Sequence, residues 1–93
     1  MYVIVQHTVT DPAAFWSLTD SARLPAHLQL HHTFPTPDGR HAVCVWEADS
    51  VEDVRDLLEP MLGGTCRNEY FAVENREGRA RPSGVPQAAG AGR

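Results

Sequence analysis

The order of hydrophobic patterns along the chain constrains its fold more than any other feature of the sequence. Four segments are rich in β-branched and aromatic residues and alternate as strands do, whereas two segments have the apolar spacing of helices. The predicted strands cover residues 1–9, 28–34, 41–47 and 68–75, and the predicted helices cover about 12–23 and 50–62. This strand-helix-strand-strand-helix-strand order is typical of a split β-α-β domain of the α+β class.

Local residues indicate where the two helices begin and stop. Asp11 and Pro12 suit the cap and the first helical position of the first helix. Ser50, followed three residues later by Asp53, resembles a capping box at the start of the second helix. Pro60 is expected to end or kink this second helix just before its own position.

Right-handed connections should place both helices on one face of a four-stranded antiparallel sheet, with the strand order 4-1-3-2. The opposite face, here called the open face, then has no helix to cover it. On our assignment of strand faces, it carries Tyr2, Ile4, Gln29, His31, Cys44, Trp46, Tyr70 and Ala72. A face this apolar is poorly suited to water, so we expect a homodimer that packs two open faces together.

Composition divides the chain into one domain and a tail. Residues 1–75 hold the patterned segments, whereas residues 76–93 consist mainly of Arg, Pro, Gly and Ala. Such a segment buries too little apolar surface to offset its ordering entropy, so we expect a disordered tail. A domain as small as residues 1–75 is marginally stable alone, which also favours association with a second copy.

Charge and residue usage exclude several classes of function. Residues 1–75 contain eleven acidic residues and four arginines, a charge of −7, which disfavours binding to nucleic acid. The chain has no lysine, which excludes Schiff-base catalysis and a phosphate-binding P-loop. No apolar run approaches the ~20 residues of a membrane span, so we expect a cytoplasmic protein without a membrane partner. Cys44 and Cys66 lack metal-ligand spacing and are expected to be plain buried thiols.

Two segments give the chain a resemblance to a known superfamily: Trp46–Leu58, with the sequence WEADSVEDVRDLL, and Asn68–Phe71, with the sequence NEYF. In this order of elements they resemble the dimeric α+β barrel proteins, in particular those like the antibiotic-biosynthesis monooxygenases, over residues 1 to about 75. The resemblance implies a ferredoxin-like fold, a homodimer through the open face and a ligand cavity between sheet and helices. The superfamily also includes haem-binding members, muconolactone-type isomerases and metal-binding proteins, so it does not select one function.

Histidine is the residue type that most suggests chemistry. His7, His32 and His41 are expected at the same end of the sheet, on the side that faces the helices. Three interpretations stay open: an acid or base that lines a ligand cavity, a metal site, and structural histidines that are partly buried and hydrogen-bonded. We name His32 and His7 as candidate catalytic residues and assign no metal site and no cofactor. His31 and His32 should not share one ion, because neighbours on a strand point to opposite faces.

Four further residues are candidates for ligand binding. Trp16 lies beside the apolar stripe of the first helix and can roof a cavity, and Phe34 can shape its wall. His41 belongs to the histidine group, and Glu47 is expected on the helix side of its strand. Burial there would raise the pKa of the Glu47 carboxyl, although its place at a strand end favours a charge that reaches water.

Three functional hypotheses follow from these observations. The first is a small-molecule-binding protein, monooxygenase-like or isomerase-like and without a cofactor, in which His32 or His7 deprotonates an aromatic or polyketide-like substrate. The second is a non-catalytic dimeric module, and the third is a His-based metal-binding protein. The sequence contains no strict catalytic motif that chooses among them.

Overall fold

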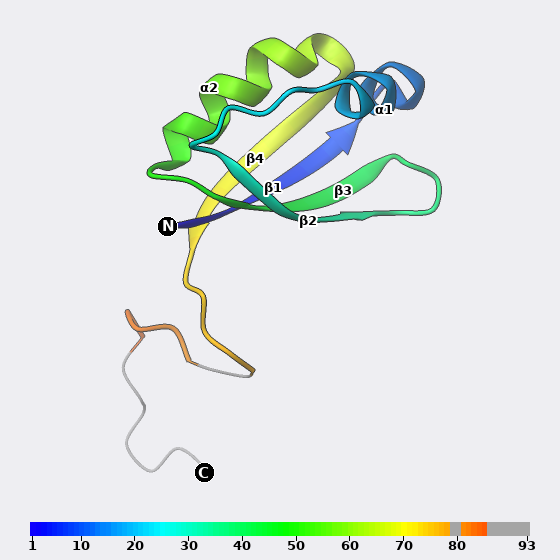
Figure 1. Ribbon diagram of the computed structural model, residues 1–93. Coiled ribbons are helices and arrows are strands. Elements are labelled where there is room, and N and C mark those ends of the chain that lie inside the picture. Colours follow the sequence, from blue (N-terminus) through cyan, green and yellow to red (C-terminus); the bar gives the residue numbers. More distant parts are fainter. Residues whose placement is uncertain (79–80, 86–93) are drawn as a thin grey trace.

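The computed structural model describes residues 1–78 and 81–85, and its elements follow the predicted order (Figure 1). The strands are β1 (Tyr2–Val9), β2 (Gln29–Pro35), β3 (His41–Glu47) and β4 (Cys66–Val73). The helices are α1 (Pro12–Asp20) and α2 (Val51–Leu62), and a short 3-10 turn, η1 (Gly63–Thr65), precedes β4. Residues 79–80 and 86–93 of the predicted tail lie outside the described residues, so the disorder of the tail stays a prediction.

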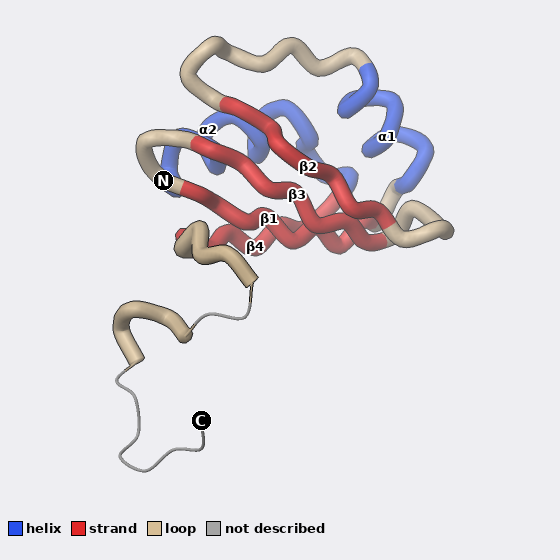
Figure 2. Tube along the Cα trace, turned by 60° about the horizontal axis from the view of Figure 1, so that its bottom comes forward, coloured by secondary structure: helices blue, strands red, loops and turns tan. Residues whose placement is uncertain are grey.

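The four strands form one antiparallel sheet in the order β2-β3-β1-β4, which confirms the predicted order (Figure 2). Both helices cover the same face of this sheet (Figure 1). The arrangement is a ferredoxin-like α+β fold. Its helices begin as the sequence indicates, because the side chains of Asp11 and Ser50 accept hydrogen bonds from the backbone N–H groups of Ala14 and Asp53.

The helix ends differ slightly from the prediction. α1 ends at Asp20 rather than near residue 23. α2 continues through Pro60 and is capped by Gly63, whose φ of 54° suits glycine. Of the two outcomes expected at Pro60, an end of the helix is excluded, because a proline in the last turn removes only a terminal hydrogen bond. Among the described residues, no helix is long and apolar enough to cross a membrane.

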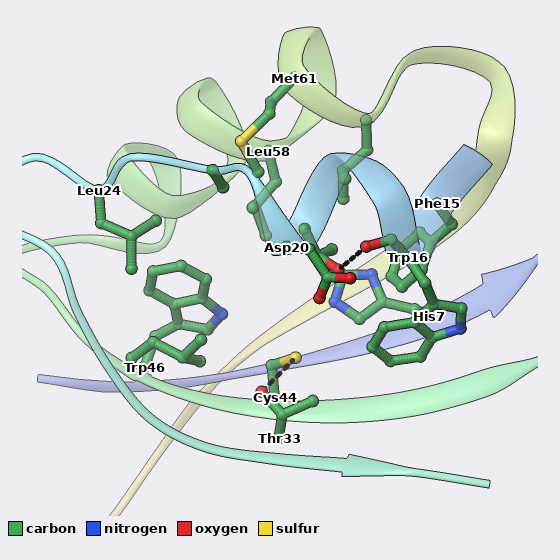
Figure 3. A pocket seen from close by; sticks show the side chains of 14 residues that line it. His7, Phe15, Trp16, Asp20, Leu24, Thr33, Cys44, Trp46, Leu58 and Met61 are labelled. Carbon is green, nitrogen blue, oxygen red and sulfur yellow. Dashed lines mark hydrogen bonds between the residues drawn. The ribbon is translucent and has the colours of Figure 1, made fainter. Parts of the chain in front are cut away.

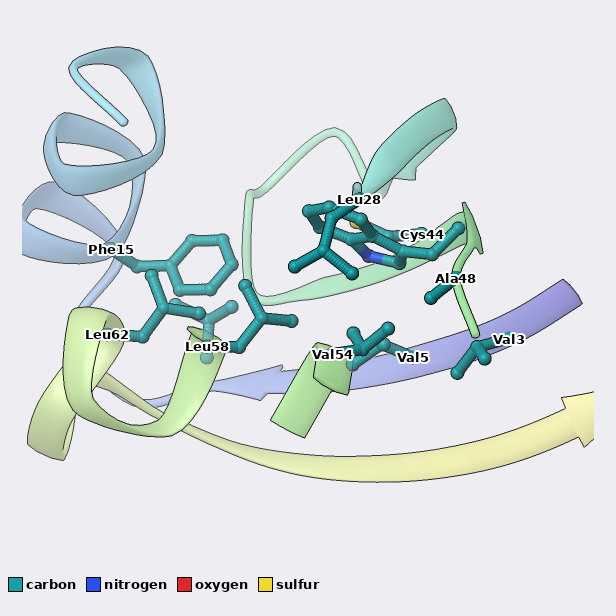
Figure 4. Close-up of a cluster of buried hydrophobic side chains, with 11 residues drawn as sticks. Val3, Val5, Phe15, Leu28, Cys44, Ala48, Val54, Leu58 and Leu62 are labelled. Carbon is teal, nitrogen blue, oxygen red and sulfur yellow. The ribbon is translucent and has the colours of Figure 1, made fainter. Parts of the chain in front are cut away.

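The hydrophobic core lies between the sheet and the helices (Figure 4). Phe15 of α1 and Val54, Leu58 and Leu62 of α2 point into it. Leu18 follows Phe15 by three residues and was therefore expected in the buried apolar stripe of α1, but it stays exposed. The strands contribute the buried residues Val3, Val5, Val9, Ala42, Cys44 and Trp46.

The strand faces differ from the prediction on β3 and β4. β1 turns Val5 and His7 toward the helices, as predicted. Val5 lies directly opposite Cys44 of β3 and Tyr70 of β4, and directly opposed residues share a face of the sheet. Cys44, Trp46 and Tyr70 therefore face the helices, and their predicted place on the open face is wrong.

One irregularity in β2 explains the error on β3. The pairing of β2 with β3 shifts between Leu30 and His32, so one extra residue is inserted there as a β-bulge. Leu30 faces the helices, whereas His32 and Phe34, beyond the bulge, point away from them. Phe34 pairs with Val43. Strict alternation from Leu30 would have placed His32 and Phe34 on the helix side, and the bulge moves both to the open face.

The open face keeps several of its predicted members and gains others. Tyr2, Ile4, Gln29 and His31 lie on it, as predicted. Ala72 pairs with Val3 and belongs to the helix side instead. The members gained are His32, Phe34, His41, Val43, Val45, Glu47, Phe71 and Val73.

Candidate functional site

A cavity of about 310 Å³ lies between the helix side of the sheet and the two helices (Figure 3). This volume is at the lower end of the range for small-molecule pockets. The sheet contributes His7, Leu30, Thr33, Cys44 and Trp46, and the helices contribute Phe15, Trp16, Thr19, Asp20, Leu58, Met61 and Leu62. Ala22 and Leu24, from the connection between α1 and β2, complete the wall. Because most of this wall is apolar, its few polar groups can set the orientation of a ligand.

His7 supplies one of these polar groups. It is 4% exposed, and its ring meets the Phe15 ring edge-on, with the centroids 5.2 Å apart. It lies directly opposite Asn68 on β4, and its Nδ1 is 2.5 Å from Asn68 Oδ1. Burial lowers the pKa of His7 more than the Asn68 bond and the Glu59 charge raise it. His7 is therefore neutral at pH 7.

The partners of Asn68 determine which nitrogen of His7 carries the proton. The Tyr70 hydroxyl donates to Glu59 Oε2 at 2.5 Å, and Asn68 Nδ2 donates to the same oxygen at 2.9 Å. These two bonds lower the pKa of Glu59, so it is a carboxylate and only accepts. The amide oxygen of Asn68 therefore faces His7, and His7 Nδ1–H donates to it. His7 Nε2 keeps its lone pair and has no hydrogen-bond partner within the described part of the chain.

Trp46 supplies a second polar group, a donor without an acceptor. The residue is 3% exposed, and its indole Nε1–H has no hydrogen-bond partner among residues 1–78 and 81–85. Figure 3 shows the indole nitrogen turned toward the interior of the cavity. Trp16, in contrast, donates from its Nε1 to the Gly39 carbonyl at 2.9 Å. The cavity wall therefore presents a free acceptor at His7 and a free donor at Trp46.

The two cysteines serve packing rather than chemistry. Both are free, and burial raises the pKa of both thiols. Cys44 is buried on the cavity floor and donates from Sγ to Thr33 Oγ1 at 3.7 Å. Cys66, which is only half-buried, donates from Sγ to Asn68 Oδ1 at 3.2 Å. Protonated thiols are poor nucleophiles, which agrees with the expectation of plain thiols.

The structure brings two of the predicted site residues, His7 and Trp16, into the cavity. The other four lie on the open face: His32, Phe34, His41 and Glu47. Their predicted place on the helix side is wrong. The bulge in β2 turns His32 and Phe34 to the open face, and the faces of His41 and Glu47 on β3 were inferred from β2 as if it had no bulge.

The predicted convergence of three histidines is also wrong. His7 faces the helices, whereas His32 and His41 lie on the other side of the sheet. The bulge places His31 on the open face beside His32, contrary to the expectation for neighbours on a strand, and His31 Nε2 is 2.9 Å from Glu47 Oε1. In the described ranges, no three His, Cys, Asp or Glu side chains are grouped so that they could hold a metal ion.

Sequence reasoning missed the residues that complete the site. The acidic residues of the second helix, Glu52, Asp53, Asp56 and Glu59, indicate by their spacing a solvated helix face. Trp46 was predicted to lie on the open face. The position of Asn68 in a predicted strand favours a strand-edge role over contact with a polar ligand. Its place beside His7 follows from the register of β1 with β4, in which the two residues are directly opposed.

The fold described above is the ferredoxin-like fold that a resemblance to the dimeric α+β barrel proteins implies. No family model, curated protein or solved structure gives a significant match to the chain, so its function is inferred from the geometry of the cavity.

Proposed function

We propose that this chain is a small-molecule-binding α+β barrel protein in which His7 accepts a proton or a hydrogen bond from an aromatic compound in the cavity. One observation carries the proposal: a buried, neutral histidine has its Nδ1 fixed by Asn68 and its Nε2 free at the wall of an apolar cavity. A buried polar atom normally has a partner, which a ligand would supply here. The aromatic rings of Phe15, Trp16 and Trp46 favour a flat ligand.

This arrangement suits general-base catalysis. A neutral Nε2 can take a proton from an O–H or an acidic C–H bond, whereas a charged imidazole cannot. Asn68 and the Glu59 charge support the imidazolium that forms, because both raise the pKa of His7. Deprotonation begins both the monooxygenase-like and the isomerase-like reactions that the resemblance suggests. We therefore propose an enzyme of one of these kinds, without a cofactor, that acts on an aromatic or polyketide-like substrate.

We also propose that two copies associate through the open face, as in the dimeric α+β barrel proteins. Large apolar side chains are exposed there: Phe34 is 59% exposed and Phe71 is 44% exposed. A second open face would cover them. The free thiols of Cys44 and Cys66 suit a reducing compartment such as the cytoplasm.

Two ligands of similar shape test the proposal. 4-Ethylphenol has a hydroxyl that can donate to His7 Nε2, and ethylbenzene lacks it. In titrations followed by NMR near neutral pH, we expect 4-ethylphenol to bind about tenfold more tightly, roughly the effect of one buried hydrogen bond. His7→Phe removes the acceptor and should abolish this preference. His32→Phe, on the open face, is the matched control and should keep it.

Two results would contradict the proposal. If the unmodified protein binds neither compound, the cavity is not a ligand site, and a non-catalytic dimeric module becomes the better account. If His32→Phe loses the preference and His7→Phe keeps it, the ligand lies on the open face.

Acid provides a further control, because protonated His7 cannot accept a hydrogen bond. The preference should therefore weaken well below pH 6.5, whereas binding of ethylbenzene should change little.

A further inference from the structure

We infer that Trp46 Nε1–H forms an oxygen-binding subsite, so that the cavity selects ring compounds with a hydroxyl at one end and a carbonyl oxygen at the other. The inference rests on the proposed function and deepens it by naming the ligand class. The indole N–H of Trp46 is a feature that the role of His7 does not explain. Trp46 is 97% buried and lines the cavity, yet its indole N–H has no acceptor among the residues described.

A buried donor without an acceptor needs an explanation, because desolvating an N–H group is unfavourable unless a hydrogen bond replaces the lost water. The second indole of the chain shows the usual solution, since Trp16 Nε1 donates to the Gly39 carbonyl at 2.9 Å. Trp46 Nε1 points into the cavity instead (Figure 3). A ligand oxygen in the cavity would complete the missing bond.

The register of the sheet places the two polar groups at opposite ends of the cavity floor. His7 lies directly opposite Ala42, and Trp46 is four residues further along β3 on the same face. At ~3.3 Å per residue, their backbones are ~13 Å apart along the strands. Between them lies Cys44, whose thiol is already bonded to Thr33. A matching ligand therefore has an apolar middle, a donor for His7 Nε2 and an acceptor for Trp46 Nε1.

These two ends also act together when a proton moves. If the ligand hydroxyl and carbonyl are conjugated through the ring, the O–H bond breaks and the proton forms an N–H bond with His7 Nε2. The electron pair left on the ligand spreads through the ring to the carbonyl oxygen. Trp46 Nε1–H then bonds to an oxygen that carries more negative charge, which strengthens the bond. The step needs no oxidant and no cofactor.

Two phenols of similar size test the subsite. 4-Hydroxyacetophenone has a carbonyl opposite its hydroxyl, and 4-ethylphenol has a methylene group in its place. In ¹H–¹⁵N spectra of the unmodified protein, we expect 4-hydroxyacetophenone to move the Trp46 indole signal downfield. The Trp16 indole signal, already bonded to Gly39, should move little. Trp16→Phe assigns the two signals, and 4-ethylphenol should leave both nearly unmoved.

Affinity provides the second readout. We expect 4-hydroxyacetophenone to bind about tenfold more tightly than 4-ethylphenol. The acetyl group also makes the phenol more acidic, which strengthens its bond to His7. Trp46→Phe separates the two causes, because it removes the indole donor and keeps the acceptor of His7. If the subsite is real, the ratio should fall several-fold in Trp46→Phe, to the part that acidity alone supplies, whereas a ratio caused entirely by acidity would not change.

The outcomes distinguish this inference from the proposed function. If both phenols bind equally well and the Trp46 signal does not move, the subsite is refuted while His7 and the cavity stand. If neither phenol binds, the proposed function and the subsite fail together. If Trp46→Phe does not fold, the indole signal of the unmodified protein still decides the question.

Discussion

Replacing Asn68 by leucine should destabilise the domain more than replacing His7 by phenylalanine, although both changes break the same hydrogen bond. Asn68→Leu strands the buried His7 Nδ1–H without an acceptor. His7→Phe leaves an amide that is still satisfied, because Asn68 Oδ1 accepts from Cys66 Sγ at 3.2 Å and Nδ2 donates to Glu59. A stranded buried donor costs about 1–3 kcal/mol, so we expect a loss of about 2 kcal/mol for Asn68→Leu and about 1 kcal/mol for His7→Phe.

The double variant gives the most informative value. When both polar groups are replaced by apolar ones, no donor is left stranded, so the cost should be about 1 kcal/mol rather than the sum of about 3 kcal/mol. The coupling energy between the two sites is then about 2 kcal/mol. Urea unfolding of the unmodified protein, the two single variants and the double variant, all at one protein concentration, measures these free energies. The slope of the unfolding free energy against urea concentration must be the same in all four. If the costs of the two single variants add up to the cost of the double variant to within about 0.5 kcal/mol, the hydrogen bond between His7 and Asn68 is refuted.

Three further predictions concern burial, assembly and packing. The folded protein should lose stability as the pH falls below 6.5, because burial depresses the pKa of His7 in the folded state and the unfolded state then binds the proton more tightly. Urea unfolding between about pH 5 and 8 should show this loss in the unmodified protein and not in His7→Phe. If the unfolding free energies of the two proteins change with pH in parallel, the burial of His7 is contradicted. Phe34→Glu should convert the dimer to a monomer in light scattering, and a monomeric unmodified protein would contradict the dimer. Gly39→Ala should cost about 1–2 kcal/mol and lower the melting temperature, because a Cβ would lie 2.9 Å from Trp16 Nε1 at a φ of +72°; an unchanged melting temperature would contradict that contact.

The sequence predicts the order of elements and of strands correctly, because this order depends on patterns that a one-residue irregularity such as a β-bulge does not change. Apolar periodicity distinguishes the strands from the helices, and the hand of the two connections determines the strand order. The helix starts follow from Asp11 and Ser50, which cap as expected. The valines of β1 place His7 on the buried side, which is why this residue is a correct candidate for the cavity.

The predicted faces of β2 and β3 depend on one residue that the sequence does not mark. The bulge in β2 contains no glycine or proline between Leu30 and His32 to reveal it. Pairing Phe34 with either His41 or Val43 gives residues 41, 43, 45 and 47 of β3 the same face as Phe34, and the structure has the pair with Val43. The wrong face of Phe34 was thus carried from β2 into β3. Trp46 was therefore assigned to the open face.

Glu59 was missed for a different reason. It belongs to α2 and meets Asn68 and Tyr70 of β4 only through the packing of the helix on the sheet. The spacing of residues along the chain does not indicate such a contact. A carboxylate on a helix with other acidic residues is most simply a solvated one, and Glu59 is indeed exposed.

The ¹⁵N resonances of the His7 imidazole test the central claim, that a free Nε2 meets the ligand. Near neutral pH, the two nitrogens should have clearly different shifts, with a proton on Nδ1 and a lone pair on Nε2. Saturation with 4-ethylphenol should shift Nε2 strongly and Nδ1 slightly. A proton on Nε2 with a lone pair on Nδ1, or a bound ligand that moves neither nitrogen, would contradict the account.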